Sequence, residues 1–214
     1  MNDPIANPDA MAAFSAAHWF GDLVGRDFGC VLADPPWAYD CTDPTCSPGG
    51  KVTGYSGGVS LYYDTMTAQQ IAAMPVQAIA AKDSVIFLWA TVPLLPDAFG
   101  VMVAWGYKYK TMLTWEKENG KGMGYWFRGV TEHCLLGVRG DVKAFRSPIK
   151  NLIRNKVGRH SAKPQQIHDI IESVTPEMDR LELFSRLHRT GWTVWGNQVE
   201  RDLLSPNKKV TDGA

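Results

Sequence analysis

Continuous apolar runs and amphipathic stretches alternate along most of this 214-residue chain. The run from Phe28 to Ala33 is followed at once by an aspartate and two prolines. This pattern predicts a buried strand that ends abruptly, because proline has no amide donor for a sheet ladder. A second run, from Ser84 to Thr91, predicts a strand covered on both faces. Further strands are predicted at Tyr107–Trp115, Thr131–Val138, Arg180–Ser185 and Trp192–Trp195.

Helical patterns separate several of these strands. Thr67 can cap a helix that we expect to reach about Ala81, with Pro75 kinking or ending it. Residues 93 to 106 suit a second helix, and Pro164 suits the first position of a third. The third has an apolar stripe at Ile167, Ile170, Ile171 and Val174. Strands that alternate with helices predict an α/β fold with a mostly parallel, doubly wound sheet, which binds ligands where its strands end.

Length and composition predict a single main domain. The chain is 45% apolar with eight tryptophans, enough to close one hydrophobic core. We expect an N-terminal arm at 1–27, the domain at 28–204 and a C-terminal tail at 205–214. No apolar run approaches the roughly 18 residues of a membrane span, and the acidic start lacks the basic region of a signal peptide. A cytoplasmic protein without membrane association is expected.

The cysteines indicate neither a disulfide framework nor a metal site. They number four and form no C-x-x-C pair, so reduced thiols are expected. Cys41 and Cys46 lack the second pair that a structural zinc site needs. We therefore predict no metal.

The zero net charge conceals a basic segment. Between Arg139 and Lys163, eight lysines and arginines stand against one acid, so this segment carries +7 and the rest of the chain −7. The segment is either a solvated loop or a surface that binds phosphates. In the second case Lys150, Arg154 and Lys156 are candidate contacts to a nucleic acid.

The sequence Asp34-Pro35-Pro36-Trp37, at the end of the first predicted strand, is the strongest chemical signal. It could be an ordinary turn beside a core tryptophan. Its place at the ligand-binding edge favours catalysis on an exocyclic amine, whose lone pair is delocalised into its ring. The Asp34 carboxylate and the Pro35 carbonyl, whose direction Pro36 fixes, can each accept one N–H of the amine. Trp37 could stack on the base.

With these residues the chain resembles the MT-A type of S-adenosylmethionine-dependent adenine N6-methyltransferases, the family of the catalytic subunit of the eukaryotic mRNA methyltransferase and its bacterial and phage relatives. The resemblance covers roughly residues 28 to 203. Its blocks, in matching order, are Asp34-Pro35-Pro36-Trp37, residues 63–67, 87–89, 105–107, 132–140, 160–164, 182–186 and 196–198. It implies a Rossmann-like domain with the β-type, permuted order, in which the catalytic loop comes first and the cofactor motifs last.

The resemblance also implies roles for individual residues. Asp34 would lie between cofactor and target amine, Tyr63 over the target base, and Glu132 on the substrate side of the pocket. Lys163, before a proline at a helix start, would meet the cofactor carboxylate. The remaining cofactor contacts would come from Glu182, Arg186, His188, Asn197 and Gln198.

These features predict an adenine N6-methyltransferase that acts on DNA, with RNA as the alternative substrate. A catalytically silent, nucleic-acid-binding partner subunit is a second class of answer, but such partners lose the aspartate and tryptophan that Asp34 and Trp37 retain. Cytosine N4 methylation would normally show a serine in place of Asp34. We expect a monomer or homodimer, with a partner subunit as a further option.

Overall fold

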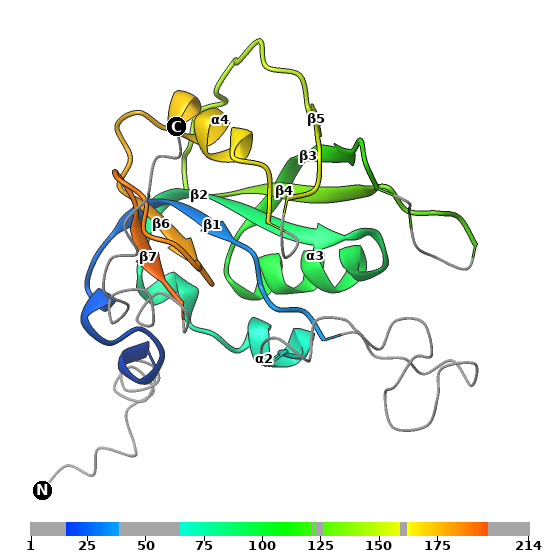
Figure 1. The fold of residues 1–214 in the computed structure, drawn as a ribbon. Coiled ribbons are helices and arrows are strands. Elements are labelled where there is room, and N and C mark those ends of the chain that lie inside the picture. Colours follow the sequence, from blue (N-terminus) through cyan, green and yellow to red (C-terminus); the bar gives the residue numbers. More distant parts are fainter. Residues whose placement is uncertain (1–15, 39–64, 121, 123–125, 159–161, 197–214) are drawn as a thin grey trace, which may run out of the picture.

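The computed structural model describes residues 16–38, 65–120, 122, 126–158 and 162–196, which form one seven-stranded sheet with helices on both faces (Figure 1). The strands are β1 (Phe28–Ala33), β2 (Ala80–Thr91), β3 (Lys108–Lys117), β4 (Thr131–Arg139), β5 (Leu152–Asn155), β6 (Arg180–Leu183) and β7 (Thr193–Trp195). The helices are α2 (Ala68–Ala72), α3 (Leu95–Ala104) and α4 (Gln166–Val174), with short 3-10 turns at Gly21–Leu23, Val76–Ala78 and Val92–Leu94. Residues 16–20 are helical as well. The predicted α/β class is confirmed.

The sheet is mostly parallel, and one strand is reversed. Its order is β5-β3-β4-β2-β1-β6-β7. β1 runs parallel to its neighbours β2 and β6. The pairs β6–β7 and β3–β5 are parallel as well. β4 is antiparallel to both of its neighbours, β2 and β3. The connection from β3 to β4 carries four glycines and suits a hairpin better than a crossover helix. Because β4 is reversed, its first residues lie at the edge where the parallel strands end.

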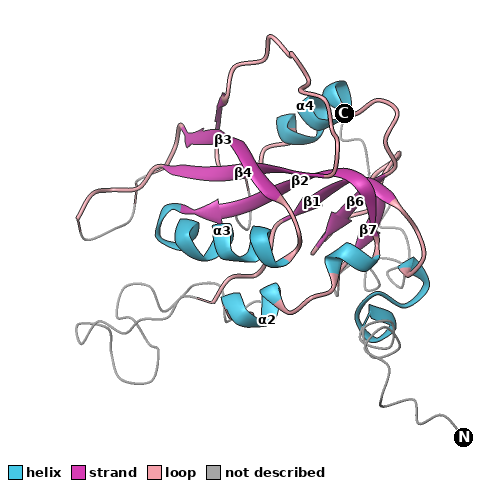
Figure 2. Ribbon diagram, turned by 180° about the vertical axis from the view of Figure 1, so that it is seen from behind, coloured by secondary structure: helices cyan, strands magenta, loops and turns pink. Residues whose placement is uncertain are grey.

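The two faces of the sheet are covered by different helices. Side chains alternate along a strand, so Ile86 and Leu88 of β2 join the core under α2 and α3, while Val85 and Phe87 join the core under α4. Figure 2 shows α3 and α4 on opposite sides of the sheet. The stripe predicted on α4 is confirmed, since its three isoleucines are buried. This two-sided burial explains why β2 reads as one continuous apolar run.

The helix predicted from Thr67 to about Ala81 is wrong in its length. The cap is present, since Thr67 Oγ1 accepts the Gln70 N–H at 3.2 Å and the Gln70 side chain accepts the Thr67 N–H at 2.8 Å. However, α2 ends at Ala72 and β2 already begins at Ala80. Pro75 explains the early end, because a proline inside a helix removes a hydrogen bond and clashes with the preceding turn.

The basic segment contains a strand that the sequence analysis did not predict. β5 pairs in parallel with β3 at the end of the sheet. Of its four residues only Ile153 is buried, and its neighbours Leu152 and Arg154 are exposed. Such a short strand with one buried side chain gives no periodic signal that could separate it from a loop.

Candidate active site

Four charged side chains meet at the edge where the parallel strands end. Asp34 follows β1, Lys117 ends β3, Glu132 begins the reversed strand β4, and Lys163 precedes α4. The Lys163 ammonium lies 2.8 Å from each carboxylate oxygen of Asp34 and 3.3 Å from Glu132 Oε2. Lys117 donates to Glu132 Oε1. These side chains are called the ion-pair cluster below, and their formal charges cancel.

Burial and mutual attraction shape the electrostatics of the ion-pair cluster. Burial alone would raise the pKa of Glu132, but the ammonium groups of Lys163 and Lys117 outweigh it and hold that pKa below its ordinary value. Burial would lower the pKa of Lys163, but Asp34 and Glu132 raise it well above its ordinary value. Lys163 is therefore a fixed cation. The Asp34 side chain is 31% exposed against 9% for Glu132, so Asp34 is the carboxylate presented to a ligand.

The backbone after Asp34 is held in one conformation. The Trp37 N–H donates to the Pro35 carbonyl at 2.8 Å, which closes a tight turn around Pro36. Met66 then bridges the loop from the other side, donating to the Pro36 carbonyl and accepting from the Ala38 N–H, both at 2.8 Å. The Pro35 carbonyl keeps a second lone pair beside Asp34. A carboxylate and a rigid carbonyl thus stand next to each other at the sheet edge.

Trp37 packs differently from what a stacking role requires. Its side chain is only 6% exposed and belongs to the core on the α2 and α3 side. Its indole N–H donates to the Trp89 carbonyl at 2.9 Å. A ring buried this way fastens the loop to β2 and offers almost no face to a base.

Glu182, predicted to bind the cofactor ribose, lies on β6 between β1 and β7. His168 of α4 lies with Nε2 3.0 Å from Glu182 Oε2, and because a carboxylate only accepts, Nε2 donates. The other nitrogen of His168, Nδ1, is buried without a hydrogen-bond partner in the described part of the chain. After β6, Arg186 is half-buried and His188 is exposed. Tyr63, Asn197 and Gln198 lie outside the described residues.

The basic residues predicted to bind substrate do not join the ion-pair cluster. Lys150, Arg154 and Lys156 are all exposed, and Arg154 Nε donates to Glu116 Oε2 at 3.0 Å. The segment starts at the opposite edge, where Arg139 donates to the Gln77 carbonyl at 3.1 Å, and crosses the sheet to β5. Their role as phosphate contacts stays a prediction.

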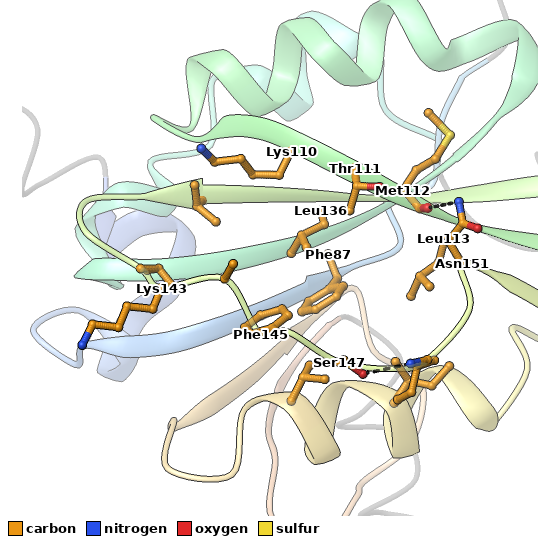
Figure 3. Close-up of a pocket in the computed structure, with 16 residues that line it drawn as sticks. Phe87, Lys110, Thr111, Met112, Leu113, Leu136, Lys143, Phe145, Ser147 and Asn151 are labelled. Atoms are coloured by element: carbon orange, nitrogen blue, oxygen red, sulfur yellow. Dashed lines mark hydrogen bonds between the residues drawn. The ribbon is translucent and has the colours of Figure 1, made fainter.

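A cavity of about 460 Å³ lies under this crossing segment (Figure 3). Phe87 and Leu136 line it from the sheet and Phe145 from the segment, while Lys110 and Lys143 stand at one end. Its walls are mainly apolar, and none of the candidate site residues contributes to them. The cavity is therefore separate from the ion-pair cluster.

The sequence analysis missed Lys117 and His168. Lys117 could have been found from the predicted strands, because a hairpin between them places the end of β3 beside the start of β4, with Trp115 opposite Glu132. His168 gave no such signal, since a histidine on an apolar helix face has no pattern that points to Glu182, fourteen residues away.

Together, the doubly wound sheet and a lysine-held aspartate directly after its first strand define an α/β domain with a candidate ligand site at the edge where the parallel strands end. The MT-A70 family model matches residues 28–198. The chain belongs to the MT-A70 family and is a methyltransferase, which confirms the family resemblance.

The relatives differ in how much of their length this chain spans. The type II methyltransferase M.MunI of Mycoplasma sp is 28% identical over 190 residues, which is 84% of this chain and 81% of that protein. A putative N(6)-adenosine-methyltransferase MT-A70-like protein of Medicago truncatula is 30% identical over 188 residues, which is 83% of this chain but only 27% of that protein. The human N(6)-adenosine-methyltransferase catalytic subunit METTL3 is 28% identical over 197 residues, which is 86% of this chain and 30% of that protein. No described helix has the length and apolar character to cross a membrane.

Proposed function

We propose that this methyltransferase uses S-adenosylmethionine to methylate the exocyclic N6 amine of adenine in DNA. The observation that carries the proposal is the contact between Lys163 and both carboxylate oxygens of Asp34, next to the fixed Pro35 carbonyl. Two acceptors held side by side can take the two N–H groups of one amine.

The amine of adenine is a weak nucleophile because its lone pair is shared with the ring. Acceptance of its two N–H groups by Asp34 and Pro35 localises the lone pair and aims it along one direction. Lys163 keeps the Asp34 carboxylate in place, and the turn around Pro36 keeps the carbonyl in place. The increase in reaction rate comes from the orientation of the amine and from acceptors that need no reorganisation during the reaction.

The residues at this edge fit S-adenosylmethionine by their chemistry. Glu182 uses Oε2 for His168, which leaves Oε1 as an acceptor for a ribose hydroxyl. Arg186 and His188 follow on the same loop as donors, and Asn197 with Gln198 would complete the set. When bound, the cofactor supplies an activated methyl group. Lys163 serves mainly to orient Asp34 and can meet the cofactor carboxylate only by giving up one of its present partners.

On the substrate side of the pocket, Glu132 would act as a member of the ion-pair cluster. Tyr63 would lie over the target base. Lys150, Arg154 and Lys156 would contact phosphates of the strand. DNA is favoured because one relative, matched over 81% of its own length, is a type II methyltransferase. RNA is the second candidate, since relatives named N(6)-adenosine-methyltransferases match the same region. The presence of Asp34 and Trp37 argues against a silent partner subunit.

The test is to incubate the full chain with methyl-labelled S-adenosylmethionine and sequence-matched DNA and RNA, and to identify the modified nucleoside by mass spectrometry. N6-methyldeoxyadenosine in the DNA arm is expected. If only the RNA becomes methylated, RNA replaces DNA as the proposed substrate. Methylcytosine, or no labelled nucleoside in either arm, would overturn the proposal.

A further inference from the structure

Trp126 and Phe127 are almost fully exposed. Their exposed fractions are 95% and 90%, the largest among big hydrophobic side chains in the described residues. Exposing two adjacent aromatic rings to water is unfavourable, and contiguous apolar surface of this kind marks a binding site. These residues are called the aromatic pair below.

The aromatic pair lies on the connection between β3 and β4, at the edge that carries the ion-pair cluster. Figure 1 shows this connection and the chain after β1 leaving the sheet on the same side. Phe127 comes five positions before Glu132, so the two backbones are at most about 17 Å apart. The rings therefore stand within reach of the candidate active site.

Two exposed cations belong to the segments around the aromatic pair, Lys156 after β5 and Arg128 on the β3–β4 connection. The Asn119 side chain bonds both backbone groups of Val157, accepting from its N–H at 2.7 Å and donating to its carbonyl at 3.5 Å. This contact fixes the β3–β4 connection to the chain that follows β5, next to Lys156. Arg128, directly after the aromatic pair, is exposed as well. The connection that carries the aromatic pair is thus hydrogen-bonded to the segment that carries Lys156.

Trp37 cannot supply the stacking face, because its ring is buried. We infer that the aromatic pair stacks on unpaired bases of a single nucleic-acid strand next to the target adenine, while Arg128 and Lys156 contact its phosphates. Stacking on exposed aromatic rings beside cations is how proteins hold single strands without reading their sequence. The inference rests on the proposed function, whose substrate it narrows to a strand with unpaired bases.

The test measures binding without catalysis. Labelled single-stranded and duplex oligodeoxynucleotides of one sequence are titrated with the full chain and with the Trp126→Ala/Phe127→Ala variant. We expect the variant to bind the single strand about 10-fold or more weakly, with an unchanged slope of affinity against salt, because stacking releases no counterions. Trp126→Phe should retain most of the affinity. Val103→Ala is the control, since Val103 is 72% exposed but lies on α3.

Equal affinity of the double variant and the wild type would overturn the inference. So would tighter binding of the duplex with the same dependence on the aromatic pair, or a change of oligomeric state in place of the binding loss. Binding that depends on the aromatic pair in a protein that transfers no methyl group would contradict the proposed function alone. Normal methyl transfer and an unchanged substrate KM in the double variant would contradict this inference alone.

Discussion

Lys163 and Asp34 are 129 positions apart in sequence, yet the Lys163 ammonium lies 2.8 Å from each oxygen of the Asp34 carboxylate. The contact joins the loop after the first strand to the segment that leads into α4. The Lys163 ammonium also lies over the Trp89 ring, 5.5 Å from the ring centroid. This arrangement makes the orientation of Asp34 depend on a distant part of the chain.

Replacing Asp34 should stop catalysis without unfolding the protein. In Asp34→Asn one acceptor of the amine becomes an amide that can turn its N–H toward the substrate, so methyl transfer should fall by about 100-fold or more. Because the side chain is partly exposed, the unfolding midpoint in urea should change little. Asp97→Asn, at an exposed aspartate of α3, is the matched control. Wild-type rates in Asp34→Asn would remove Asp34 from the mechanism.

Lys163→Met should damage both activity and stability. Without the ammonium, Asp34 and the buried Glu132 lose the cation between them, and breaking a buried pair in this way costs about 3 kcal/mol of unfolding free energy. The rate of methyl transfer should fall because Asp34 is no longer held. Lys163→Arg keeps the charge and should recover much of the stability. Urea unfolding and kcat are the measurements, and an unaltered kcat in Lys163→Met would exclude an orienting role.

Glu132 should make the protein sensitive to acid. Its pKa in the folded state is lower than in the unfolded chain, so in acid the unfolded chain binds more protons and stability rises with pH. The contribution is present above about pH 4.5 and is lost as the pH falls through the folded pKa. Glu132→Gln should therefore show a shallower loss of unfolding free energy on acidification than the wild type. Glu118→Gln, at an exposed glutamate, is the control, and parallel pH profiles for wild type and Glu132→Gln would contradict the assignment.

Charge reversal in the basic segment should weaken nucleic-acid binding. A variant with Lys150→Glu, Arg154→Glu and Lys156→Glu removes three exposed cations, so the slope of log affinity against log salt should decrease by roughly 2 to 3. Stability should change by less than about 1 kcal/mol, because the ion pair of Arg154 with Glu116 is exposed. Lys82→Glu, at the far end of β2, is the control. An unchanged salt slope would identify the segment as a solvated loop.

The sequence by itself determined the buried strands and the position of the Asp34 loop. Apolar runs such as Phe28–Ala33 and Ser84–Thr91 reflect burial on both faces of a sheet, which is a local demand on each residue. Pro35 and Pro36 end the first strand directly after Asp34. The position of Asp34 at the sheet edge could therefore be predicted without any tertiary contact.

Only the tertiary structure decided which residues meet. The reversal of β4 brought Glu132 to the edge where Asp34 lies. Burial of the Trp37 ring in the core on the α2 and α3 side removed it as a stacking surface. The route of the basic segment kept Lys150 away from the ion-pair cluster. Local patterns carry no information on such contacts. They arise from strand order and loop paths, which depend on the packing energy of the whole domain.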